Sequence, residues 1–192
     1  MPDAPTGTTH GYAYDLRTGT MTDLGTLGGS SSTATDVSGS VVVGQSRTAG
    51  NALSGYAYDL RTGARTDLGW HLRTAELVSG GTAVGGDGML STTVDLTTQA
   101  SAMVGPGSGV TQVSAIAGNH LVGDDFAPNS LAFAERVDTG AFTSLQSLGG
   151  LNSHAAQVNR AGVVAGSAAL TPPDKVTANG PFHAAIWVPV PE

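Results

Sequence analysis

Cysteine is absent from this chain of 192 residues, which excludes disulfides, thiolate zinc sites and cysteine nucleophiles. Aromatic residues make up only 5% of it, and no apolar run approaches the roughly 18 residues that a membrane-spanning helix needs. Basic residues are scarce as well: eight Lys and Arg against 15 Asp and Glu give a net charge of −7. An acidic surface repels nucleic acid and anionic membranes, so neither is expected as a partner.

Motifs that bind phosphates or activate nucleophiles are also missing. The sequence contains no G-x-S-x-G, no G-x-x-x-x-G-K-[ST], no H-E-x-x-H and no G-x-G-x-x-G before a helix, so no cofactor is expected. The first residues, MPDAPTGTTHGYAYD, have neither the basic nor the apolar segment of a secretion signal. We therefore expect a cytoplasmic protein if Met1 is the native start, and an extracellular one if a signal peptide has been removed.

Glycine, in contrast, is abundant at 28 residues, and the sequence repeats itself. The nine residues GYAYDLRTG occur at Gly11–Gly19 and again, unchanged, at Gly55–Gly63. A second motif, in which apolar residues precede a glycine, occurs four times with a period of roughly forty residues. Its copies are TDVSGSVVVGQS (Thr35–Ser46), ELVSGGTAVGGD (Glu76–Asp87), SAIAGNHLVGDD (Ser114–Asp125) and AQVNRAGVVAGS (Ala156–Ser167).

Each repeat predicts about four short strands. The motif supplies the first two, and a segment such as Gly55–Leu60, whose side chains alternate between two faces, supplies the third. A glycine turn at Arg61–Gly63 then leads to the fourth, Ala64–Gly69. Four-stranded repeats of roughly forty residues are typical of β-propeller blades, and a β-helix, whose rungs are shorter, is the alternative.

We therefore predict an all-β fold: a small β-propeller over residues 10–192, after a flexible segment at residues 1–9. The repeats lie roughly at 10–33, 34–74, 75–112, 113–154 and 155–192. The first holds only the last two strands, so Thr20–Leu24 is expected to complete the sheet begun by Ala156–Val188 and close the ring. Because His10–Leu16 and Phe182–Val188 then compete for one place, there are four blades, or five with one incomplete, or a strand exchanged between subunits of a homo-oligomer.

The segment His10–Ser46 resembles the HAF repeat family of bacterial proteins. Their repeats read H-A-F-L-W, then D-L-G-T-L-G-G, then a Ser/Ala segment, then I-N-x-x-G-x-V-V-G. The corresponding residues here are HGYAYDL (His10–Leu16), FHAAIWV (Phe182–Val188), DLGTLGG (Asp23–Gly29) and SLGG (Ser147–Gly150), and the second and third repeats match less well. The resemblance implies a propeller-like repeat fold, usually on extracellular proteins, without a common catalytic activity.

Candidate functional residues are sought where one repeat departs from the others, since shared residues are expected to serve packing. After Gly69 the second repeat reads WHLRTAELV, which brings together Trp70, His71, Arg73 and Glu76. Histidine exchanges protons near neutrality, arginine or glutamate can orient it, and tryptophan can stack on a ligand. The alternative is a shortened loop held by an Arg–Glu pair, with Trp70 as a packing residue.

His154 occupies the matching place in the fourth repeat, and Asp36 and Gln157 share the next aligned position. In a closed ring these loops would surround one channel mouth. We therefore expect a shallow polar pocket lined by Asp36, His71, Glu76, His154 and Gln157, with Trp70 and Arg73 as further ligand contacts. Solvated loop histidines are the competing interpretation.

A metal site is a weak alternative in GDDFAPNS (Gly123–Ser130), where Asp124, Asp125 and Asn129 offer oxygen ligands. The spacing lacks the alternation and closing glutamate of a calcium loop, so an acidic β-turn is favoured and no metal is expected. His10 and His183 stand at equivalent repeat positions, which favours a structural hydrogen bond over metal ligation.

Two functions stay open. The first is a non-catalytic binding or scaffold module that holds a small molecule, glycan or protein at a channel mouth. The second is a cofactor-independent cyclase, isomerase, lyase or hydrolase, with His71, Glu76 and His154 as acid–base residues. A purely structural extracellular repeat is a third, which requires a secretion signal outside this sequence. Since propellers serve many functions, the binding module is the favoured prediction.

Overall fold

The computed structural model describes residues 7–69, 71–87, 89–105, 111–126, 129–171 and 180–189. These residues form 17 β-strands and no helix, so the predicted all-β class is confirmed. A search of the same residues for a helix of membrane-spanning length and hydropathy finds none.

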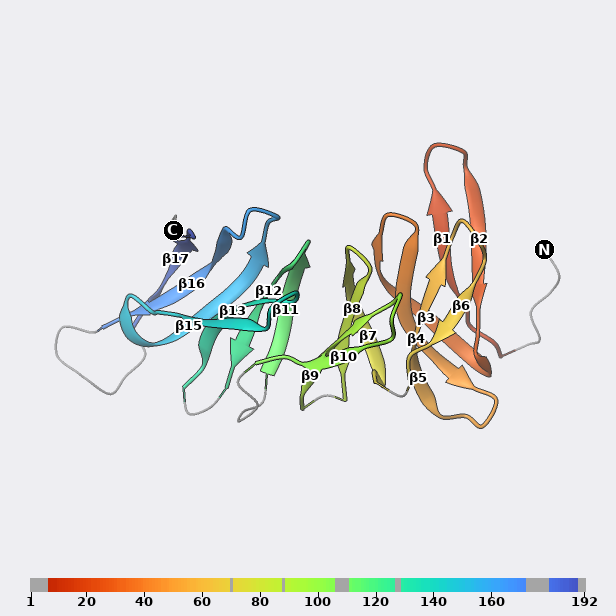
Figure 1. Ribbon diagram of the computed structural model, residues 1–192, viewed down its shortest axis with the longest axis horizontal. Coiled ribbons are helices and arrows are strands. Elements are labelled where there is room, and N and C mark those ends of the chain that lie inside the picture. The colour runs from red at the N-terminus through yellow and green to blue at the C-terminus, as the bar shows by residue number, and fades with distance from the viewer. Residues whose placement is uncertain are drawn as a thin grey trace. The chain divides into compact units, whose positions relative to one another are not determined.

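The strands pair in chain order into five sheets (Figure 1), which we call the N-terminal hairpin, sheets A, B and C, and the C-terminal sheet. The N-terminal hairpin is β1 (Gly11–Asp15) and β2 (Thr20–Gly25). Sheet A is β3 (Gly28–Ser38), β4 (Val41–Thr48), β5 (Leu53–Asp59) and β6 (Arg65–Asp67), and sheet B is β7 (Thr74–Ser79), β8 (Thr82–Gly86), β9 (Ser91–Asp95) and β10 (Ser101–Met103). Sheet C is β11 (Thr111–Ala117), β12 (His120–Asp125), β13 (Leu131–Arg136) and β14 (Ala141–Leu145), and the C-terminal sheet is β15 (Gly149–Val158), β16 (Val164–Leu170) and β17 (Phe182–Trp187).

Two compact units contain these sheets. Unit 1 comprises Met1–Asp87 and Val94–Ser101, and unit 2 comprises Gly88–Thr93 and Ala102–Glu192. The hairpin and sheet A belong to unit 1, sheet C and the C-terminal sheet belong to unit 2, and the boundary passes through β9 and β10 of sheet B.

Sheets A, B and C have the four strands that each repeat predicts. The outer two sheets are incomplete: the hairpin corresponds to strands three and four, and the C-terminal sheet to strands one to three. The predicted sheet that joins Thr20–Leu24 to Ala156–Val188 is not among the described sheets. The reason is that β2 pairs with β1, while β17 takes the third place beside β16.

The repeated nine residues form a β-hairpin turn in both places. The Asp15 carboxylate accepts the N–H of Arg17 at 2.8 Å, and Asp59 accepts that of Arg61 at the same distance. Gly19 and Gly63 close the two turns at φ of 69° and 71°, in the left-handed region that glycine adopts without strain. The predicted glycine turn is thus confirmed.

The glycine of the four-fold motif lies at a crowded point of the second strand. Gly44 pairs with Ala34 beside the β-bulge of β3, and with Tyr56 on its other side. A Cβ atom on Gly44 would overlap the carbonyl oxygen of Thr33, and one on Gly123 would overlap that of Gln112. The repeat therefore requires glycine because two backbones approach each other closely there.

The two LGG segments form the same turn. The Thr26 hydroxyl donates to the Gly29 carbonyl at 2.9 Å, and the Ser147 hydroxyl donates to the Gly150 carbonyl. Leu27, between them in the first copy, donates its N–H to the buried hydroxyl of Ser46 at 2.8 Å. These motif residues bond to one another and to the adjoining strand, as expected for residues that serve packing.

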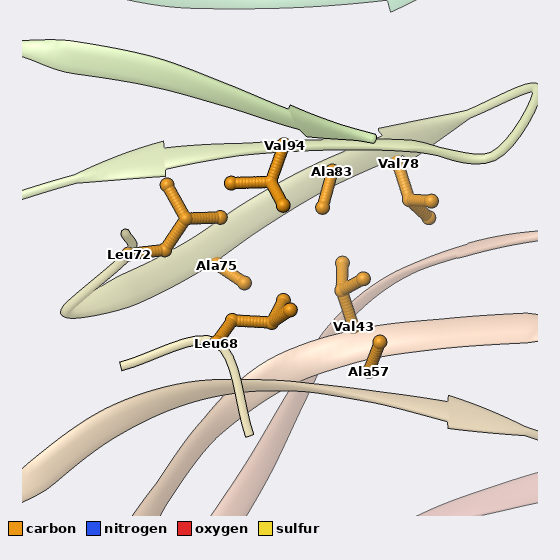
Figure 2. Packing of buried hydrophobic residues seen from close by; sticks show 8 residues of the cluster. All are labelled: Val43, Ala57, Leu68, Leu72, Ala75, Val78, Ala83 and Val94. Atoms are coloured by element: carbon orange, nitrogen blue, oxygen red, sulfur yellow. The ribbon is translucent and has the colours of Figure 1, made fainter. Parts of the chain in front are cut away.

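In unit 1 the main apolar cluster lies between sheets A and B (Figure 2). Val43 and Ala57 project from sheet A toward Ala75 and Val78 of β7, and all four are buried. Each fully buried valine or leucine contributes roughly 1.5–3 kcal/mol to stability. Unit 2 has a corresponding cluster between sheet C and the C-terminal sheet, which contains Ala115, Val122, Ala132, Leu145, Ala155 and Val164.

Buried hydroxyl groups connect neighbouring sheets. Ser153 on β15 accepts the N–H of Ala132 at 2.9 Å and donates to the Leu145 carbonyl at 2.7 Å. Ser32 on β3 has the same role in unit 1, since it accepts the N–H of Gly11 and donates to the Gly25 carbonyl. One side chain on a first strand thus holds both the third strand and the end of the fourth strand of the preceding sheet.

Candidate functional site

The predicted site residues are divided between the two units. Asp36, His71, Arg73 and Glu76 belong to unit 1, and His154 and Gln157 belong to unit 2. Trp70, the predicted stacking residue, lies outside the described residues.

Asp36 links sheets A and B. Its Oδ1 accepts the N–H of Val37 and its Oδ2 accepts that of Val78, both at 2.8 Å, so the carboxylate is engaged by backbone on both oxygens. Glu76 is exposed, and the Thr74 hydroxyl donates to its Oε1 at 3.2 Å. Within the described part of unit 1, no hydrogen bond or ion pair joins His71, Arg73 or Glu76 to one another.

A groove of about 700 Å³ lies in unit 1, between the N-terminal hairpin and β3. Tyr12 and Tyr14 of β1 form part of its wall, and Ala34 and Val37 of β3 form part of its floor. The exposed fractions are 60% for Tyr12, 52% for Tyr14 and 59% for Val37. Such exposure of neighbouring large apolar groups is typical of a binding surface.

This exposure differs between the two copies of the nine residues because their neighbours differ: in the second copy Tyr56 packs against Leu24 of β2 and Val42 of β4. Tyr56 stands at the place of Tyr12 in the second copy of the same nine residues, yet Tyr56 is fully buried. β5 pairs with β4 along one edge and with β6 along the other, whereas among the described residues β1 pairs with β2 alone. In the same way Val78, which corresponds to Val37, is only 4% exposed beneath sheet A. The groove is therefore the place that strands one and two of a complete sheet would fill.

Polar groups line the rest of the groove. Threonine residues and the acidic residues Asp15 and Asp36 are also among those that line it. The backbone N–H of Arg17 holds the pKa of Asp15 below its ordinary value, so this carboxylate is ionised at neutral pH. A groove lined by tyrosine, threonine and an ionised aspartate suits a ligand with apolar faces and several hydrogen-bond donors.

A second polar arrangement lies in unit 2, where Asp124 of β12 meets His154 of β15. Nδ1 of His154 is 2.6 Å from Asp124 Oδ2, and the N–H of Ala155 donates to Oδ1 at 3.2 Å. The Asp124 side chain is almost fully buried, while that of His154 is 59% exposed. Burial raises the pKa of Asp124, and the Ala155 N–H and His154 oppose that rise.

The surroundings of this pair are open. His154 lines a hollow of about 480 Å³ together with Ser114, Ser167 and small apolar residues. Gln157, three residues further along β15, is exposed. A histidine whose Nδ1 is fixed by a buried carboxylate keeps Nε2 available for proton transfer, so this arrangement has the chemistry of a general base.

The remaining metal and histidine predictions fall on structural contacts or on single exposed groups. Asp124 uses its carboxylate on His154 and Ala155, and Asn129 is exposed. Within the described ranges, no three His, Asp or Glu side chains, Asp125 included, are grouped so as to hold a metal ion. His10 has the expected structural hydrogen bond, since its Nδ1 lies 3.0 Å from both Asp23 oxygens. His183, at the equivalent place in β17, is exposed.

Two features escaped the sequence analysis. Tyr12 and Tyr14 were not identified as groove residues, although the sequence held a signal. A copy of the glycine motif (Thr35–Ser46) precedes the second copy of the nine residues, Gly55–Gly63, and no such copy precedes Gly11–Gly19 in the sequence. The contact between Asp124 and His154 had no local signal, because 30 residues separate the two and only the packing of two sheets brings them together.

The comparisons with known proteins concern the fold alone. No protein-family model matches the chain, and no curated protein sequence matches it either. Among solved structures, it is similar to the crystal structure of TolB from Acinetobacter baumannii, a β-propeller protein, with a TM-score of 0.51 and 14% sequence identity. The match covers 91% of this chain and 45% of TolB, so the chain spans less than half the length of that protein. Together with the repeated four-stranded sheets, this similarity supports a propeller-like all-β fold.

Proposed function

We propose that this chain is a non-catalytic binding and scaffold module, and that it holds its ligand in the groove between the N-terminal hairpin and β3. One observation carries the proposal: in two identical segments, Tyr56 is fully buried, whereas Tyr12 lies exposed beside the exposed Val37. Because the sequence is the same, the difference comes from the surroundings: Tyr56 packs against Leu24 of the N-terminal hairpin and Val42 of its own sheet. The ligand classes that suit the groove are a protein segment and a glycan.

The same proposal makes the sheets blades of a small propeller of the HAF repeat type, four in number or five with one incomplete. In its support, the two LGG segments form one kind of turn, and His10 bonds to Asp23 where Ser54 bonds to Asp67 in sheet A. A repeat of this kind supplies many similar surfaces, and the groove is where the repetition is interrupted.

Binding at the groove is tested by NMR titration of the ¹⁵N-labelled chain with glycans and with strand-forming peptides. A ligand is expected to shift amide signals of β1 and β3, and Tyr12→Ala with Tyr14→Ala should weaken its binding by about tenfold or more, which corresponds to one lost aromatic contact of roughly 1.4 kcal/mol. Leu16→Ala is the matched control, because Leu16 is 91% exposed on the same hairpin and does not line the groove. If no ligand of either class moves these signals, or if the tyrosine variant binds equally well, the proposal is wrong.

The second candidate is a cofactor-independent hydrolase, lyase, isomerase or cyclase, and the Asp124–His154 contact favours it. The buried carboxylate accepts the Nδ1–H of His154, which leaves the Nε2 lone pair free to take a proton from water or from a substrate. The hydroxyls of Ser114 and Ser167 line the same hollow and can orient a small substrate. In this candidate His154 acts as the base and Asp124 positions it.

Turnover of a panel of small esters and hydroxy acids tests this second candidate. His154→Ala should lower kcat/KM by about 100-fold or more, as expected for the loss of a general base, and Asp124→Asn should lower it less. His183→Ala serves as control, since it removes an exposed histidine from the same sheet. Equal rates in His154→Ala and His183→Ala would exclude this role.

A further inference from the structure

The two incomplete sheets lack complementary parts. The N-terminal hairpin has the places of strands three and four filled, and the groove lies where strands one and two belong. The C-terminal sheet has strands one to three and ends at β17. β1 and β17 occupy the same place in the repeat, so β15 and β16 together with β1 and β2 would make one complete four-stranded sheet.

The exposed faces of these two sheets also correspond to the two sides of a buried interface. In unit 1, three cross-strand neighbours of sheet A (Asp36, Val43 and Ala57) contact Ala75 and Val78 of β7, as seen for the apolar members in Figure 2.

Asp36, Val43 and Ala57 of sheet A have three counterparts in the C-terminal sheet. These are Gln157, Ala165 and Ile186, which are cross-strand neighbours in the same way and are all exposed. Ala75 and Val78 of β7 have two counterparts on the floor of the groove. These are Ala34 and Val37, which are exposed too. The chain thus presents both halves of an interface that it already forms once between sheets A and B.

Pairing within the sheets favours an exchange of the third strand. The glycine of the second strand lies opposite an aromatic residue of the third strand in sheet A (Gly44 and Tyr56) and in sheet C (Gly123 and Phe133). In the C-terminal sheet the corresponding Gly166 lies opposite Ala185. An aromatic ring covers a cross-strand glycine better than a methyl group does. Tyr12 is the residue of β1 that would take this place.

We propose that β15 and β16 of a second copy of this chain fill the groove, and that β1 replaces that copy's β17 beside β16. This inference rests on the proposed function, because it names the ligand of the same groove. The register follows from sheet A: Tyr12 lies opposite the second copy's Gly166, and Ala13 lies opposite its Ala165. Each copy offers one groove and one C-terminal sheet, so the contact is head-to-tail and closes into a ring or continues into a longer array.

In the single chain the strands concerned are paired within their own sheets. Among the described residues β16 pairs with β17 and β1 pairs with β2, and no sheet contains both β1 and β16. The edge of β1 that faces away from β2 is therefore unpaired among the described residues. An unpaired strand edge is a template for a strand from another molecule. Ile186 of β17 is already 70% exposed, so its release costs little apolar burial, whereas release of Trp187 gives up its packing against the apolar cluster of unit 2.

Engineered disulfides test the predicted register, and the absence of native cysteine makes the readout unambiguous. Residues directly opposite in antiparallel strands have Cα atoms about 4.5–5.5 Å apart, within the range that a disulfide spans. Ala13→Cys with Ala165→Cys should therefore give an interchain disulfide on oxidation, found by non-reducing electrophoresis and peptide mapping. Ala13→Cys with Ala161→Cys is the matched control and should not cross-link, because Ala161 is an exposed residue outside β16.

Sedimentation equilibrium gives the second measurement. The unmodified chain should associate reversibly, and Val37→Asp should weaken this association by about tenfold or more, because a carboxylate would be buried without a partner. Val37 is already exposed in the single chain, so the variant should keep its fold and its thermal stability. Leu16→Asp, on the same hairpin but outside the groove, should associate like the unmodified chain.

The possible outcomes separate this inference from the proposed function. An intrachain disulfide between positions 13 and 165, at low protein concentration, would overturn it in favour of a ring closed by one chain. A chain that stays monomeric at all concentrations would also overturn it. If that monomer still binds a glycan or peptide in the groove, the proposed function stands and only the second copy is excluded. If neither a second copy nor any other ligand binds there, both are wrong.

Discussion

Gly44→Ala is expected to lower the free energy of unfolding by about 3 kcal/mol or more, which exceeds the effect of most overpacking substitutions. The added Cβ would overlap the Thr33 carbonyl oxygen and approach the Ala34 Cα, and both are backbone atoms that cannot turn aside. β3 would have to move away from β4, which would open the packing around Val43. Urea denaturation followed by circular dichroism measures the loss.

Gly50→Ala is the matched control for this substitution. Gly50 is exposed between β4 and β5, has no positive φ, and a Cβ there would make only an ordinary contact with the Thr48 hydroxyl. Its unfolding free energy should change by less than about 0.5 kcal/mol. If Gly44→Ala were tolerated as well as Gly50→Ala, the close approach of β3 and β4 would not be the reason for the repeated glycine.

The repeats of the sequence were sufficient to predict the sheets, because the features that define them are local. Turn glycines such as Gly63 and the close-packed Gly44 recur at fixed spacing, and each acts on strands near it in the chain. The structural hydrogen bond of His10 was predictable for the same reason, because its partner Asp23 lies in β2 of the same hairpin. Local repetition therefore determined both the strand count of sheets A to C and the class of fold.

The ends of the array were harder to predict. Sequence alignment assigns His10–Leu16 and Phe182–Val188 to the same place in a sheet, and alignment alone does not decide which of them pairs with β16. In the structure β17 takes that place, because it follows β16 in the chain and pairs with it over six residues. The tyrosines of β1 are consequently exposed, and the groove arises from a missing neighbour rather than from any residue peculiar to β1.

The candidate site depended on contacts between sheets, which sequence spacing does not determine. Asp36 was predicted to line a pocket and is among the residues that line the groove, but its carboxylate accepts two backbone N–H groups, one of them from Val78 of the next sheet. His154 was singled out as a loop residue in the alignment but lies within β15, and its partner Asp124 was considered only as a metal ligand. In both cases the partner lies at least 30 residues away, and only packing shows the pairing.

Ser153 carries the second large expected effect, because its hydroxyl joins two sheets of unit 2 from a position that is 1% exposed. Ser153→Val should lower the free energy of unfolding by about 2–3 kcal/mol, since it leaves the Ala132 N–H and the Leu145 carbonyl buried without this partner. Ser153→Thr keeps the hydroxyl with nearly the same shape as valine, so it isolates the hydrogen bonds from the change in volume.

Sheet C provides a precedent for the threonine. Thr111 begins β11, and its hydroxyl lies 3.5 Å from the Ser91 nitrogen and donates to the Val104 carbonyl at 3.3 Å, which is the same bridge made with longer bonds. Ser153→Thr should therefore lose less than about 1 kcal/mol, and hydrogen exchange at Ala132 should stay slow in it and become fast in Ser153→Val. Equal stability of the two variants would mean that the volume of the side chain, and not its hydroxyl, joins sheet C to the C-terminal sheet. The expected difference between them would instead make a hydrogen-bonded hydroxyl the conserved connection between successive repeats within this chain, with Ser32 as its counterpart in unit 1.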